Sequence, residues 1–78
     1  MKKIEIFGTG CPKCEKLYEA AEGVAKEMEI EYTISKIQEI KEIVARGVAM
    51  TPALAVDGKV VSSGSIPTAE KIKEYLAD

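Results

Sequence analysis

The sequence predicts an α/β fold whose elements run in the order strand, helix, strand, helix, strand, strand, helix. Two observations carry this prediction. Short apolar runs of β-type residues alternate with longer segments whose apolar residues recur at helical spacing. Near the C-terminus, Asp57-Gly58 separates two apolar runs, which is typical of a hairpin. One parallel crossover followed by a hairpin gives a four-stranded mixed sheet with helices on both faces.

The first strand and helix flank a glycine-rich loop. Residues 3–7 form a short run of isoleucine and phenylalanine that ends at Gly8. Pro12 suits the first turn of a helix, because the N–H that it lacks would be unpaired there. The apolar face of this helix comprises Cys14, Leu17, Tyr18, Ala21, Val24, Ala25 and Met28.

A second strand and helix follow. Residues 31–34 read as a strand, and Ser35 with Gln38 three residues later forms a capping-box pattern at a helix start. We expect this helix to end at Gly47. Its inward stripe would be Ile37, Ile40, Ile43 and Val44.

The last elements are a hairpin and a helix. Residues 53–56 and 59–62 flank the Asp57-Gly58 turn, and Pro67-Thr68 opens the final helix. The inward face of that helix comprises Ala69, Ile72, Tyr75 and Leu76.

Composition narrows the functional classes. A chain of 78 residues predicts one small domain spanning residues 1–78. The net charge is −2 and lysines alternate with glutamates, so no basic stripe is expected to hold a nucleic acid. No apolar run reaches the length of a membrane span or a signal-peptide core. We therefore expect a cytoplasmic protein that binds neither nucleic acid nor membrane.

Both cysteines, Cys11 and Cys14, lie in the motif GCPKC. This spacing serves a redox-active disulfide, half of a structural zinc site or a copper-type clamp. In a reducing cytosol such a pair is more often catalytic or metal-binding than structural. At a helix start, unpaired N–H groups and the helix dipole favour a thiolate, which points to Cys11, and Lys13 adds a positive charge. Cys14 falls one turn deeper on the apolar face. Thiol–disulfide exchange needs this asymmetry between an exposed thiolate and a neighbour that resolves the mixed disulfide.

Three motifs together carry a family resemblance. They are GCPKC, Met50-Thr51-Pro52 directly before the strand ALAV, and DGKVVSSGSIPT. With them the chain resembles the thioredoxin superfamily, in particular the short thioredoxin/glutaredoxin-like redox proteins of archaea and anaerobic bacteria. The resemblance implies a thioredoxin-like fold with Cys11 as nucleophile and Cys14 as resolving thiol.

The resemblance also assigns the residues around the cysteine pair. Pro12 and Lys13 would lie in the active-site loop, and Met50, Thr51 and Pro52 would form the cis-proline loop, whose backbone holds an extended substrate. The buried aspartate that moves protons in thioredoxins has no clear counterpart. Glu5 on the first strand is not assigned a catalytic role.

The function expected from these residues is thiol–disulfide oxidoreduction, with the protein acting as a monomeric dithiol carrier that reduces protein disulfides. No bound cofactor is implied, and electrons would come from a separate reductase, since no G-x-G-x-x-G fingerprint is present. The alternative is a soft-metal module that holds copper or zinc with the same two thiolates. Against it, Thr9 stands where copper chaperones carry a methionine, and there are no histidines or further cysteines to complete a zinc site.

Overall fold

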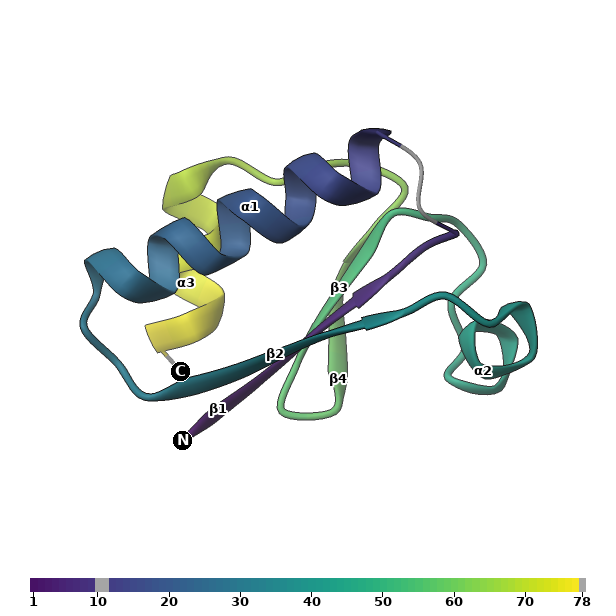
Figure 1. Cartoon of the computed structure of the whole chain (residues 1–78), viewed down its shortest axis with the longest axis horizontal. Helices are drawn as coiled ribbons and strands as arrows, with labels where there is room; N and C mark the ends of the chain where they lie inside the picture. The colour runs from purple at the N-terminus through teal and green to yellow at the C-terminus, as the bar shows by residue number, and fades with distance from the viewer. Residues whose placement is uncertain (10–11, 78) are drawn as a thin grey trace.

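The computed structural model describes residues 1–9 and 12–77 and has the predicted order of elements (Figure 1). The elements are β1 (Lys2–Phe7), α1 (Pro12–Glu27), β2 (Tyr32–Ile37), α2 (Ile40–Ala45), β3 (Ala53–Val56), β4 (Lys59–Ser63) and α3 (Ala69–Ala77). The four strands form one sheet in the order β2-β1-β3-β4. β1 pairs parallel with β2 and antiparallel with β3, and β3 pairs antiparallel with β4, so the predicted mixed sheet is confirmed.

Side chains of β1 alternate between two layers. Ile4 and Ile6 face α1 and α3, whereas Glu5 and Phe7 face the side of α2. The larger core lies under α1 and α3, which run along the same face of the sheet (Figure 1). Its buried members are Ile4, Ile6, Leu17, Ala21, Val24, Ala25, Leu54, Val56, Ile72 and Leu76. The smaller core on the side of α2 comprises Phe7, Ile43, Val48, Ala53 and Ala55.

The glycine signals of the sequence are confirmed. At the hairpin, Asp57 has φ 52° and Gly58 has φ 84°, the two positive angles that a type I′ turn requires. Gly47 follows α2 with φ 80°, and its N–H donates to the carbonyl of Val44 at 3.0 Å. A left-handed glycine therefore ends α2, as predicted.

The predicted start of the second helix is wrong. β2 continues through Ser35 to Ile37, because β1 pairs with it along its whole length and Phe7 lies opposite Ile37. The short α2 begins only at Ile40, and its N-cap, Glu39, makes no side-chain capping bond. The capping box therefore does not form, since pairing with β1 satisfies the backbone that it would have capped.

The predicted apolar stripe of this helix is also only partly buried. Ile43 packs into the smaller core, and Ile37 reaches the same core from β2. Ile40 is 68 % exposed and Val44 is 66 % exposed. A helix of six residues covers this face through one side chain, which leaves its outer side in solvent.

Candidate functional site: Cys14 between the end of β1 and the 50–52 loop

Of the two cysteines, Cys14 lies in the described part of the chain, whereas Cys11 lies outside it. Cys14 is in the first turn of α1, which begins at Pro12, and is 6 % exposed. Pro12 and Lys13 are exposed beside it. The sequence places Cys11 directly before the helix start, and its predicted role stays a prediction.

The sulfur of Cys14 packs against the backbone at the end of β1. Gly8 is buried there, and its N–H donates to the carbonyl of Ile37 at 3.0 Å. A Cβ placed on Gly8 would overlap the Sγ of Cys14 and would lie 3.2 Å from the Cβ of Cys14. The missing side chain of Gly8 is therefore the space beside which the sulfur lies.

The loop before β3 lies next to the same space. The Thr51–Pro52 peptide bond is cis, and Pro52 is buried. The carbonyl of Pro52 accepts a hydrogen bond from the N–H of Gly64 at 2.9 Å, which ties the loop to the segment after β4. The Cβ of Thr51 lies 4.0 Å from the position that a Cβ on Gly8 would take. The end of β1, the first turn of α1 and the 50–52 loop thus meet around Gly8.

Met50 extends this meeting point to the surface. It is 62 % exposed, and its Cε would lie 3.3 Å from a Cβ placed on Gly64. An exposed thioether in this loop provides an apolar contact for whatever approaches it. Of the residues predicted from the sequence, the structure thus brings Cys14, Thr51 and Pro52 close to one another. Pro12, Lys13, Met50 and Thr51 are exposed, and Cys14 and Pro52 are buried.

An exposed salt bridge joins the first turn of α1 to the sheet. Lys36 on β2 donates to the carboxylate of Glu15 at 2.8 Å and lies 4.8 Å from the centroid of the Tyr18 ring. The hydrogen bond to Glu15 raises the pKa of Lys36 above its ordinary value of 10.5. Because Glu15 follows Cys14 directly, this exposed contact joins the residue next to the thiol to β2.

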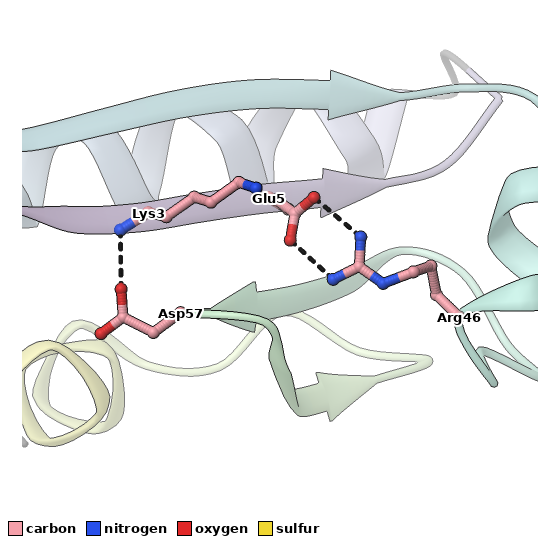
Figure 2. A network of polar contacts seen from close by, with 4 residues as sticks. All are labelled: Lys3, Glu5, Arg46 and Asp57. Atoms are coloured by element: carbon pink, nitrogen blue, oxygen red, sulfur yellow. Dashed lines mark hydrogen bonds and ion pairs between the residues drawn. The ribbon is translucent and has the colours of Figure 1, made fainter.

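Sequence reasoning missed the partner of Glu5 (Figure 2). Glu5 is 4 % exposed on β1, and Arg46, just after α2, donates to both of its oxygens at 2.7 and 2.9 Å. The guanidinium also lies 5.3 Å from the centroid of the Phe7 ring. Hydrogen bonding from Arg46 outweighs burial and lowers the pKa of Glu5 below 4.5. A glutamate inside an otherwise apolar strand is the signal that could have indicated such a partner.

Two further properties of the described residues bear on the functional classes. Among residues 1–9 and 12–77, no three histidine, cysteine, aspartate or glutamate side chains gather closely enough to hold a metal ion. Within the same ranges, no helix has the length and apolar character needed to cross a membrane.

Comparison with known proteins places the chain in a family. The family model described as a thioredoxin domain matches residues 2–77. The chain belongs to the thioredoxin family. It is 45 % identical over 76 residues to a thioredoxin of Methanocaldococcus jannaschii, an alignment that covers 97 % of this chain and 87 % of the relative. It is 39 % identical over 77 residues to a thioredoxin of Methanothermobacter thermautotrophicus, with 99 % and 100 % covered.

Membership of the thioredoxin family confirms the predicted fold and the predicted general function, thiol–disulfide oxidoreduction. Neither comparison favours the metal-binding alternative.

Proposed function

We propose that this thioredoxin-family protein is a dithiol electron carrier that reduces protein disulfides, with Cys11 as the attacking thiol and Cys14 as the resolving thiol. One observation carries this assignment. The sulfur of Cys14 is buried in the first turn of α1, between the end of β1 and the 50–52 loop, and Cys11 stands three positions earlier in the chain. A held, buried thiol beside an earlier cysteine suits resolution better than first attack.

The reaction runs in two exchanges. The Cys11 thiolate attacks one sulfur of the substrate disulfide, the substrate S–S bond breaks, and the other substrate sulfur leaves as a thiolate that takes up a proton. Cys14, deprotonated, then attacks the Cys11 sulfur, and the second substrate sulfur leaves and is protonated. The substrate gains two electrons and two protons, and the protein is left with a Cys11–Cys14 disulfide.

The surroundings of the helix start favour this order of attack. The positive end of the α1 dipole and the exposed ammonium of Lys13 would stabilise an anion at the residue before Pro12. Cys14 lies in the packed layer, where a thiolate is less well solvated. The proposal therefore gives Cys11 the larger thiolate fraction at neutral pH.

The 50–52 loop is proposed to hold the substrate. Backbone groups around Thr51 would pair with an extended segment of the substrate protein, and the exposed side chain of Met50 would cover an apolar residue next to the substrate disulfide.

The proposed setting is the cytoplasm, where a separate flavoprotein reductase restores the dithiol of a monomeric carrier. Turnover assays with such a reductase and with glutathione test the donor, and turnover with glutathione alone contradicts it.

The division of labour between the two thiols is tested by trapping. Cys14→Ser should capture a substrate disulfide and stall as a mixed disulfide, because the thiol that would release it is gone. Cys11→Ser should capture little under the same conditions. Mass spectrometry of both variants after exposure to a protein disulfide measures the adducts. Equal trapping by both variants, or trapping through Cys14 alone, overturns the assignment.

A further inference from the structure

We propose that Gly8 is a positioning residue for the resolving thiol: by lacking a side chain, it leaves the space in which the sulfur of Cys14 lies. This inference rests on the proposed function, because it concerns the second exchange. It extends the site beyond the cysteine motif, since Gly8 lies outside the GCPKC segment and has no side chain that could react.

The backbone does not explain why a glycine stands here. In the described part of the chain, the glycines with positive φ are Gly47, Gly58 and Gly64. The φ of Gly8 lies outside the left-handed region, so its conformation is open to other residues. The reason for a glycine at position 8 is therefore steric. The first atom that a side chain there would meet is the Sγ of Cys14.

The sulfur has little freedom to give way. Rotation about χ1 of Cys14 moves the Sγ but leaves its Cβ 3.2 Å from a methyl group on Gly8, which is a tight contact. In a helix two χ1 rotamers are common, so a displaced sulfur has one ready alternative. The helix start itself is tied to β2 through Glu15 and Lys36. An alanine at position 8 must therefore move the sulfur, the first turn of α1, or both.

Either movement acts on the resolving step. In that step the Cys14 sulfur forms a bond to the Cys11 sulfur while the bond from Cys11 to the substrate breaks, and the departing sulfur takes the electron pair and then a proton. A disulfide fits only a narrow range of Cβ–Cβ distances and dihedral angles. Misplacing the attacking sulfur by about 1 Å can slow such a step by about a hundredfold.

The kinetic test uses the aromatic disulfide 5,5′-dithiobis(2-nitrobenzoate) with the reduced full-length protein. Attack by Cys11 releases one thionitrobenzoate, and attack by Cys14 on the resulting mixed disulfide releases the second. Gly8→Ala should slow the second release about tenfold to a hundredfold more than it slows the first. Gly23→Ala is the matched control, because a Cβ on Gly23 meets nothing within 4 Å, and both releases should keep their wild-type rates.

A second measurement asks whether the sulfur is what the methyl group meets. Gly8→Ala should lower the urea midpoint of unfolding in the wild-type background and lower it much less in Cys14→Ala, where the Sγ is absent. Equal losses in both backgrounds, or failure of both Gly8→Ala proteins to fold, mean that the methyl group meets something else and overturn the inference. If Gly8→Ala fails to fold in the wild-type background but folds in the Cys14→Ala background, the inference is supported.

The outcomes separate this inference from the function on which it rests. If the wild-type protein releases both thionitrobenzoates and Gly8→Ala does so at the same rates, Gly8 has no positioning role and the proposed function stands. If the wild-type protein releases one thionitrobenzoate or none, the Cys11–Cys14 mechanism is wrong and the positioning role falls with it.

Discussion

At the scale of single residues, Arg46 sets the charge of Glu5. A carboxylate that accepts two hydrogen bonds from one guanidinium is strongly favoured in its ionised form. Its lowered pKa makes Glu5 a weak base, and strand alternation places it on the side of α2, away from Gly8 and Cys14. Both facts indicate that Glu5 takes no part in the thiol chemistry and instead anchors the end of α2.

This anchor predicts a pH-dependent stability. The pKa of Glu5 in the folded state lies below 4.5, so its contribution is present above that value and is lost as the pH falls through the folded pKa. Glu5→Gln should lower the free energy of unfolding at pH 7 by about 1–3 kcal/mol, because Arg46 loses its charged acceptor. Its deficit should shrink as the pH falls below about 4.5 and through the folded-state pKa of Glu5, where the wild-type carboxylate becomes protonated.

Urea unfolding across this pH range measures the difference, with the exposed Glu31→Gln as the control. A constant gap between wild type and Glu5→Gln at every pH would mean that the ion pair contributes through packing alone.

The Glu5–Arg46 ion pair also shows what could not be predicted from the sequence. Glu5 and Arg46 are 41 positions apart, and no local pattern around either residue indicates that the two are in contact. Glu5 also lies opposite Ala55 on β3 and Ser35 on β2, and these pairings likewise join segments that are far apart in the sequence. The grouping of Cys14 with Thr51 is different, because the motifs GCPKC and Met50-Thr51-Pro52 predicted it through a family resemblance.

At the scale of elements, local signals succeeded where backbone chemistry alone decides. Asp57-Gly58 and Gly47 each need a positive φ, and each was predicted from residue type. The capping box at Ser35 failed because strand pairing is not local. The run of hydrogen bonds between β1 and β2 extends to Ile37, and a pattern confined to four residues cannot register it.

The end of α2 gives a prediction with an internal control. A Cβ on Gly47 or on Gly23 meets nothing within 4 Å, so the two positions differ in backbone and not in space. Gly47 has φ 80°, whereas Gly23 lies inside α1. Gly47→Ala should therefore lower the free energy of unfolding by about 1–2 kcal/mol, because an L side chain is strained there.

Gly23→Ala should instead raise the free energy of unfolding by up to about 1 kcal/mol, since alanine is the better helix former. Both values come from urea or thermal unfolding of the two variants. Changes of the same sign would show that space at the two positions, and not φ, controls the outcome.

At the scale of the whole molecule, the two faces of the sheet are unequal. α1 and α3 cover one face together and share the larger core with β1 and β3. The other face is covered by α2, which contributes Ile43 while Ile40 and Val44 remain in solvent. An isolated helix of six residues is too short to be stable in water, so α2 depends on that one contact and on the ion pair of Arg46.

The unequal cover of the two sheet faces predicts global unfolding from one face and local unfolding of α2 from the other. Leu17→Ala removes a fully buried side chain from the larger core and should lower the global free energy of unfolding by about 2–5 kcal/mol. Amide hydrogen exchange should then speed up throughout β1, β3 and α1. Ile43→Ala should speed up exchange chiefly in α2, because this helix can detach while the larger core stays closed. Ile40→Ala, at an exposed position of the same helix, should change neither pattern. If Ile43→Ala accelerates exchange in α1 as much as in α2, the two faces unfold as one unit, and the picture of a separately opening α2 is wrong.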